Sequence, residues 1–346
     1  MMAATYNYIA LTKPRVVLLL QITALCAVVV HEMQNSEFGV GSLETMAVVL
    51  VGGYLTAGGA NAINMWYDRD IDPKMTRTAN RPLSIGSVSA NSALLFGIAL
   101  SLIGVIWFAI LSNQIAAFWA SFSILFYVFV YSMWLKRRTP QNIVIGGIAG
   151  STPPVIGWAA CEDGLRISTS SPLSALDSLF DLGGLMPWFM FILIFLWTPP
   201  HFWALALYRS GEYAQVGIPM MPNVKGPAKT IKEMKVYAIL LVILSLAAPM
   251  SYGEMGEDGA LYHILGLTVV CLSIWYASTI WRIDILEEPD ETGRIASAAS
   301  SFFISMLYLA MMFVILVLAS FGNWGAIFGA AATIASIGKI EFGKSS

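Results

Sequence analysis

Long uninterrupted apolar runs, separated by short charged segments, constrain this chain more than any other feature of its sequence. A helix needs about 20 apolar residues to cross the hydrocarbon core of a bilayer, and nine runs approach this length. Only 12% of the 346 residues are charged, whereas soluble domains carry roughly 25%. This excludes an ordinary soluble enzyme and predicts an all-α polytopic membrane protein. The expected spans are 14–33, 46–65, 92–112, 115–135, 142–161, 185–206, 236–252, 261–281 and 300–321.

Lysine and arginine are distributed unevenly between the two sets of loops that nine spans create. Cytoplasmic loops are enriched in these residues, and 16 of the 19 fall on the side of the N-terminus, the others being Arg166, Lys339 and Lys344. The N-terminus is therefore expected in the cytoplasm and, with nine spans, the C-terminus outside. The roughly twelve residues before the first span are too few for a transit peptide, which favours a prokaryotic plasma membrane.

The remaining segments indicate a single membrane domain, 1–346, because the loops are too short to fold separately. The stretch 325–340 is apolar but too short to predict a full span, so the sequence leaves open an interfacial helix and a membrane-embedded segment. The loop 162–184 is interpreted as a solvated connection without chemistry. A net charge of −2 gives no indication of a nucleic-acid partner. The cysteines have neither disulfide nor metal-site spacing and are expected to be small buried residues: Cys26, Cys161 and Cys271.

The segment 61–82, which ends the second span, carries the most informative polar pattern. Asn64, Asp68 and Asp72 recur every four residues, so a helix places them on one face, from which Asp70 points away. Hard oxygen ligands in such a row suit Mg²⁺ that also holds the phosphates of a substrate. The alternative is a solvated loop whose acids and bases pair with one another. Carboxylates at a membrane edge are usually functional, so the pattern predicts a Mg²⁺–diphosphate site.

Basic residues near these carboxylates are candidates to bind the remaining phosphate charge. Three of them follow the aspartates, and three are consecutive at the end of the fourth span. The consecutive cations are also typical of a membrane anchor, and we expect one or two of them to turn inward. The predicted diphosphate-binding residues are Lys74, Arg77, Arg81, Lys136, Arg137 and Arg138.

The N-x-x-x-D-x-x-x-D pattern of these residues resembles that of the intramembrane aromatic prenyltransferases, the UbiA superfamily. Longer blocks resemble a narrower group within it, the protohaem IX farnesyltransferases, and follow one another in order over most of the chain. The matching blocks are NMWYDRDID at 64–72 with MTRT at 75–78 and RPL at 81–83, LKRRTPQN at 135–142 with the glycine pair at 146–147, TPPHFWALAL at 198–207, and GIPMMP at 217–222.

The resemblance implies that a farnesyl group moves from farnesyl diphosphate to a vinyl group of protohaem IX (haem b). With addition of water this makes haem O for haem-copper oxidases. It further implies that Asn64, Asp68 and Asp72 hold Mg²⁺, and that haem A synthase or oxidase-assembly proteins are partners. The alternative within this chemistry is a quinone-precursor or chlorin acceptor. A transporter would carry ionisable groups near the midplane of its spans, and a scaffold would not need the aspartate pattern.

His201 follows Pro199 and Pro200, which are expected to break the sixth span and open irregular backbone toward a cavity. A lone histidine is usually a hydrogen-bonded interior residue, but imidazole is also a common haem ligand. Because the resemblance implies a haem substrate, His201 is a candidate haem-binding residue. Tyr208 and Glu212 continue this region, where many family members carry a second aspartate pair that this chain lacks. Aromatic candidates to stabilise an allylic cation or hold the porphyrin are Trp66, Trp197 and Trp203.

Overall fold

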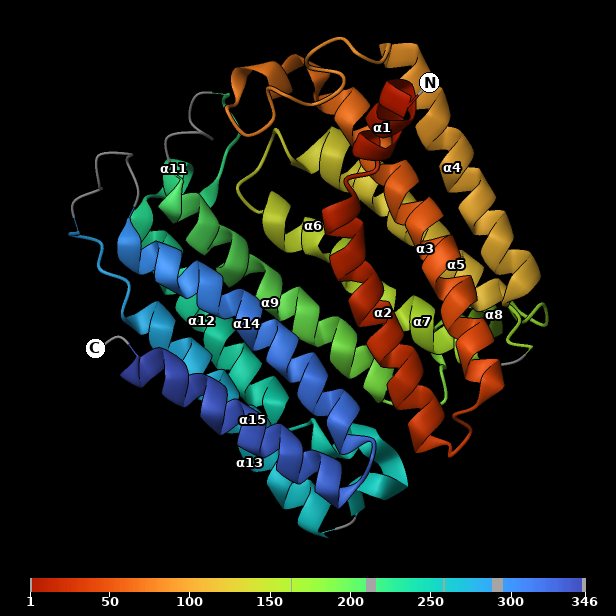
Figure 1. The fold of residues 1–346 in the computed structure, drawn as a ribbon, viewed down its shortest axis with the longest axis vertical. Helices are drawn as coiled ribbons and strands as arrows, with labels where there is room; N and C mark the ends of the chain where they lie inside the picture. Colours follow the sequence, from red (N-terminus) through yellow and green to blue (C-terminus); the bar gives the residue numbers. More distant parts are fainter. Residues whose placement is uncertain (1, 163, 210–215, 258, 288–294, 344–346) are drawn as a thin grey trace.

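The computed structural model describes residues 2–162, 164–209, 216–257, 259–287 and 295–343, and the regular structure of these residues is helical. Ten of the helical segments are long and apolar enough to cross a membrane. They form one bundle, with α9 near its centre (Figure 1). The membrane segments contain α2 (Pro14–Gln34), α3 (Val40–Tyr67), α4 (Ala90–Leu111), α5 (Gln114–Leu125) with the π-helical segment Phe126–Leu135, α6 (Asn142–Ser151) with α7 (Pro153–Cys161), α9 (Met186–Tyr208), α12 (Pro227–Ser245), α13 (Gly259–Trp281), α14 (Ala296–Ala319) and α15 (Asn323–Phe342).

Each of the nine predicted spans corresponds to one of these segments, with most ends agreeing within a few residues. The largest difference is in the seventh, which begins at Pro227 because a lysine-rich polar turn extends the helix before its apolar part. The fifth span consists of two helices, α6 and α7, and Pro153 occupies the first turn of α7, where its missing N–H costs no hydrogen bond.

The tenth membrane helix, α15, contains the stretch 325–340, for which the sequence left open an interfacial helix and a membrane-embedded segment. It packs against α13 and α14, and small residues on its inner face, including Gly325 and Gly329, are buried. Near its end, Glu341 forms an ion pair with Arg282 at 2.9 Å, just beyond the end of α13. The chain therefore returns along the bundle after α14. This places Lys339 at the end of the bundle that holds most of the basic residues, whereas the expected C-terminus lay at the other end.

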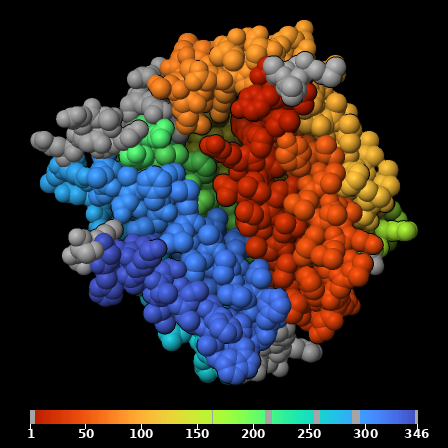
Figure 2. Space-filling model, viewed as in Figure 1, coloured from red at the N-terminus to blue at the C-terminus, as the bar shows by residue number. Residues whose placement is uncertain are grey.

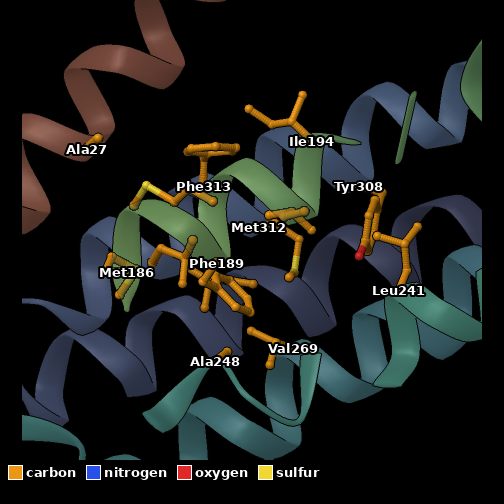
Figure 3. Packing of buried hydrophobic residues seen from close by; sticks show 14 of the residues in the cluster. Ala27, Met186, Phe189, Ile194, Leu241, Ala248, Val269, Tyr308, Met312 and Phe313 are labelled. Atoms are coloured by element: carbon orange, nitrogen blue, oxygen red, sulfur yellow. The ribbon is translucent and has the colours of Figure 1, made fainter. Parts of the chain in front are cut away.

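The core is formed where α9, α12, α13 and α14 pack together (Figure 3). Phe189 of α9 lies near Met312 of α14 and Val269 of α13, whereas Leu241 of α12 lies beside Tyr308 of α14, and all five side chains are buried. Dispersion contacts between such side chains hold helices together in a bilayer, where no hydrophobic force drives their association.

Two local expectations differ from the structure. The helix α9 continues through Pro199 and Pro200 and does not break. Neighbouring helices support membrane helices at proline, and α9 is packed against α6, α12 and α14. The connection 162–184 contains α8 (Pro172–Phe180), whose last turn accepts a hydrogen bond from Trp119 Nε1 at 3.0 Å. It is thus an amphipathic helix lying against the bundle, not merely a solvated loop.

Candidate functional site

The predicted site lies where α3 ends. The helix stops at Tyr67, and two short 3₁₀ turns, Asp68–Asp70 and Asp72–Lys74, continue the chain. The side chains are nevertheless buried or exposed as the spacing of a continuous helix predicts. Asn64, Asp68 and Asp72 are at most 3% exposed, whereas Asp70 is exposed. We call the end of the bundle that carries these residues the aspartate end.

Three cations surround the buried polar residues. Lys136 forms an ion pair with Asp68, and Arg81 Nη1 lies 2.7 Å from Asp72 Oδ2. Lys13 Nζ donates a hydrogen bond of 2.7 Å to Asn64 Oδ1. When Lys13 is protonated, these three cations outnumber the two carboxylates, and the resulting positive charge suits an anionic ligand.

Lys13 is a site residue that sequence reasoning missed, because its position before the first span was attributed to membrane orientation. It precedes α2 in a left-handed backbone conformation, with φ of 52°. Residues other than glycine rarely adopt this conformation, and such strain is often found at functional sites. Burial, and then the nearby Arg81 and Lys136, lower the pKa of Lys13 to about 7. The strained backbone was not readable from the sequence, although Pro14 marked the turn.

The π-helical segment Phe126–Leu135 brings the fourth span to the aspartates. Within this wider helix, Ser132 Oγ donates a hydrogen bond of 2.8 Å to the carbonyl of Tyr127, five residues earlier. Ser132 Oγ also accepts a hydrogen bond of 2.9 Å from Asn64 Nδ2, and Lys136 follows directly after the segment. Such π-helical turns are rare and are frequently found at functional sites.

The other basic candidates lie at the rim of the site. Arg137 binds Asp70 through two hydrogen bonds of 2.7 Å, and Asp70 raises the pKa of its guanidinium. The side chains of Lys74, Arg77 and Arg138 are exposed. Of the six predicted cations, Arg81 and Lys136 therefore contact the buried carboxylates directly, Arg137 reaches their edge, and three remain outside.

The glycine pair of α6 sets the spacing between the two sides of the site. A Cβ atom on Gly146 would lie 2.3 Å from Tyr131 Cδ2 in the π-helical segment. A Cβ atom on Gly147 would lie 3.1 Å from Thr198 Cγ2 on α9. Only glycine permits α6 to pack this closely against the π-helical segment, and little more than glycine fits against α9.

A small apolar cluster brings the four sequence blocks together. Ile71 of the aspartate block packs with Ile143, which follows the LKRRTPQN block, and with Ala206 of the TPPHFWALAL block. Ile218 and Met220 of the GIPMMP block complete this cluster. Segments that are far apart in the sequence thus meet beneath the aspartates.

His201 lies on α9 and faces α14. Its imidazole is sandwiched between Trp197 and Phe302, at 4.2 and 4.8 Å between ring centroids. Nδ1 lies 2.6 Å from Ser305 Oγ, and Nε2 has no hydrogen-bond partner among the described residues. The side chain is therefore held in one orientation, with one ring nitrogen available to a ligand.

The other candidates are separated from His201. Trp203 is completely buried and packs edge-on against Tyr237 of α12, so it belongs to the core. Trp66 lies under Arg69, which is exposed. Tyr208 is half-buried and its ring lies 6.4 Å from that of Phe303. Glu212 falls outside the described residues.

The donor set at the aspartate end fits a hard divalent cation. Asp68 Oδ1 is shielded from solvent and makes no hydrogen bond with a described residue. Its ion-pair partner on that side is Arg137 Nη2, 3.5 Å away. A buried carboxylate oxygen without a hydrogen bond is costly, and a metal ion there would satisfy it.

Comparison with known proteins places these features in a family context. Residues 20–297 match the model of the UbiA prenyltransferase family. The chain is 40% identical to "Protoheme IX farnesyltransferase" of Bartonella henselae, over 92% of this chain and 91% of that protein. It is 42% identical to the protein of the same name from Bartonella tribocorum, over 89% and 88% of the two chains.

Solved structures show the same fold. A UbiA homologue from Aeropyrum pernix K1 superposes with a TM-score of 0.61 and 20% identity, over 87% of this chain and 96% of that one. A UbiA homologue from Archaeoglobus fulgidus, solved with DMAPP and Mg²⁺, gives 0.58 and 18%, over 90% and 99%.

Proposed function

The chain belongs to the UbiA prenyltransferase family and farnesylates haem to make haem O, and we propose that Asn64, Asp68 and Asp72 form its active site. Relatives that are 40% and 42% identical over most of the chain carry the name of this activity. They favour haem over the alternative quinone-precursor or chlorin acceptor. The observation that supports the site is the group of three cations around two buried carboxylates.

The residues of the site would act on farnesyl diphosphate in three ways: by holding Mg²⁺, by binding the diphosphate and by attracting it from solution. Mg²⁺ held by Asp68 and Asp72, with Asn64, would supply positive charge that stabilises the departing diphosphate. Lys13, Arg81 and Lys136 would bind its outer oxygens, in place of their present partners. The exposed Lys74, Arg77 and Arg138 would attract the anion from solution, since they have no place inside the site.

The reaction then needs three changes of bonding. The C1–O bond of farnesyl diphosphate breaks, and its electron pair leaves with the diphosphate. The π electrons of a haem vinyl group form the new bond to C1, and water adds to the resulting cation and releases a proton. No strongly basic side chain is required for this last step.

We assign His201 to the haem substrate. Ser305 holds Nδ1, which leaves Nε2 to contact the iron or orient the porphyrin. Trp197 stacks on the imidazole and donates its Nε1 hydrogen to the carbonyl of Ser305 at 2.8 Å, so it fixes this arrangement. Trp197 is therefore proposed as a positioning residue, whereas the burial of Trp203 removes it from this role.

We further propose that the protein lies in the bacterial plasma membrane with the aspartate end in the cytoplasm. The basic residues concentrated at that end support this orientation. A soluble diphosphate substrate would then enter from the cytoplasm, while its apolar tail lies among the helices. The product haem O would pass to haem A synthase or oxidase-assembly proteins.

The proposal is tested with the purified protein in detergent, supplied with haem b, farnesyl diphosphate and Mg²⁺. The expected product, separated by chromatography, is haem heavier by one farnesyl group plus water, and EDTA should abolish it. Asp68→Asn should lose the product, whereas Asp70→Asn, which changes an exposed neighbour, should keep it. Diphosphate release with an aromatic acceptor, but not with haem, would contradict the haem assignment.

A further inference from the structure

We propose that the end of the bundle opposite the aspartates contains a second metal site, for a transition-metal ion of the Zn²⁺ type. Its ligands are His31 and Glu32 near the end of α2 and Cys161 at the end of α7, and Glu162, directly after Cys161, lies against the other ring nitrogen of His31. Lys13 and His31 lie at opposite ends of α2, so at 1.5 Å per residue the two sites are separated by roughly 27 Å. This site is thus independent of the diphosphate site.

The ligand atoms are already gathered. One ligand atom each from His31, Glu32 and Cys161 lie within 4.8 Å of one another. His31 Nδ1 lies 3.3 Å from Glu32 Oε1. The other ring nitrogen, Nε2, lies 2.9 Å from Glu162 Oε1, so Glu162 would orient the imidazole from outside the ligand set. A tetrahedral Zn²⁺ with bonds of about 2.0–2.3 Å places its ligands roughly 3.3–3.8 Å apart. The site therefore closes around the ion with shifts of about 1 Å.

The charge of this region favours a cation. A cavity of about 540 Å³ beside the cluster is lined by four glutamates and by no lysine or arginine. Glu32 is 7% exposed, yet among the described residues neither it nor Glu162 forms an ion pair with lysine or arginine. A buried carboxylate is costly without a counter-charge. The glutamates that line the cavity are Glu32, Glu37, Glu44 and Glu162.

Surrounding groups hold the ligands in place. Ser42 Oγ donates a hydrogen bond of 2.6 Å to Glu32 Oε2, which leaves Oε1 to the metal. Asn113 Nδ2 donates hydrogen bonds to the carbonyls of Ala159 and Glu162, and so fixes the turn that carries Cys161.

The donor atoms select the class of metal. A thiolate and an imidazole suit Zn²⁺ and its neighbours, whereas Mg²⁺ prefers oxygen ligands alone. On binding, the ion replaces the thiol proton of Cys161, which now points to the carbonyl of Gly157 at 3.3 Å. The competing arrangement has no metal: a protonated His31 lies between the two carboxylates as an internal ion pair.

Cobalt distinguishes the two arrangements because a thiolate bound to Co²⁺ gives a charge-transfer absorption in the near ultraviolet. The full chain in detergent, with excess Mg²⁺ present, is titrated with Co²⁺. We expect a thiolate band that saturates at one Co²⁺ per chain and that Zn²⁺ displaces. Cys161→Ser should remove the band and weaken Co²⁺ binding roughly 10-fold or more, and His31→Gln should also weaken binding.

Matched variants make the result decisive. Cys271→Ser changes an exposed cysteine elsewhere and should leave the band unchanged, as should Asp68→Asn. Near-normal prenyl transfer by Cys161→Ser would show that this variant is folded. Absence of the band in the wild-type chain, or its survival in Cys161→Ser, would overturn the proposal. Its loss in Asp68→Asn would assign the ion to the diphosphate site and equally overturn it.

Discussion

Asn64 Nδ2 donates a hydrogen bond to Ser132 Oγ at 2.9 Å, and this contact joins the end of α3 to the π-helical segment that continues α5. Because Asn64 also donates to Asp68 at 3.1 Å, the serine orients a proposed metal ligand indirectly. Ser132→Ala is expected to lower turnover roughly 10-fold and to raise the Mg²⁺ concentration needed for half-maximal rate. Steady-state assays at varied Mg²⁺ measure both effects.

The control for this prediction is Ser123→Ala, which removes a hydroxyl from the same span but away from Asn64. An unchanged Mg²⁺ dependence in Ser132→Ala would contradict the role of the contact.

The two aspartates of the site are expected to be far more sensitive than the exposed aspartate between them. Asp68→Asn and Asp72→Asn should each reduce turnover by roughly 10²-fold or more, because charge that stabilises the departing diphosphate is lost. Asp70→Asn breaks only the exposed pair with Arg137 and should change turnover by less than about 3-fold. Single-turnover assays with labelled farnesyl diphosphate measure these rates. Full activity in Asp68→Asn would show that this residue does not act on the diphosphate.

The close contact of α6 predicts a stability difference between two glycines one turn apart. Gly146→Ala places a methyl group 2.3 Å from the ring of Tyr131 and is expected to cost about 1–3 kcal/mol. Gly150→Ala meets no atom within 4 Å and should be neutral or slightly stabilising. Thermal unfolding in detergent compares the two variants. Equal melting temperatures would mean that α6 does not require this close packing.

His201 is expected to affect haem more than farnesyl diphosphate. His201→Ala should raise the KM for haem roughly 10-fold or more, with little change in the KM for farnesyl diphosphate, because we assign the imidazole to the haem substrate and not to the diphosphate. His263→Gln changes an exposed histidine and serves as the control. Haem titration followed by absorption would also show a changed Soret band in His201→Ala. An unchanged haem KM and an unchanged spectrum would return His201 to a packing role between Trp197 and Phe302.

The course of α15 gives a topological prediction. A green fluorescent protein fused after Gly322 should be outside the cytoplasm and dark, whereas a fusion after Gly343 should fluoresce, since α15 returns to the aspartate end. Fluorescence of whole cells, normalised to protein amount, decides between them. Two dark fusions would support the outer C-terminus that nine spans predict.

Much of the architecture could be predicted from the sequence because apolar length is a local property that directly reports membrane crossing. The burial of Asp68 and Asp72, but not Asp70, followed from helical spacing alone, even though the helix ends at Tyr67. The roles of Lys13 and Ser132 could not be predicted, because they depend on a strained backbone and a π-helical turn that bring distant segments together.

The errors have related physical causes. Proline usually interrupts a helix, but the packing of α9 on three sides outweighs that local tendency at Pro199 and Pro200. The apolar residues of α15 are interspersed with glycine and alanine, so its mean hydropathy is low for a membrane helix. Those same small residues permit its close packing on α14, which only the folded chain reveals.

The return of α15 also bears on protein engineering. Because the start of α2 and the end of α15 lie at the same end of the bundle, a polar linker could connect the last helix of one copy to the first helix of another without crossing the bilayer. Covalent tandem chains carrying one intact and one Asp68→Asn unit are therefore accessible. They would report whether neighbouring copies work independently.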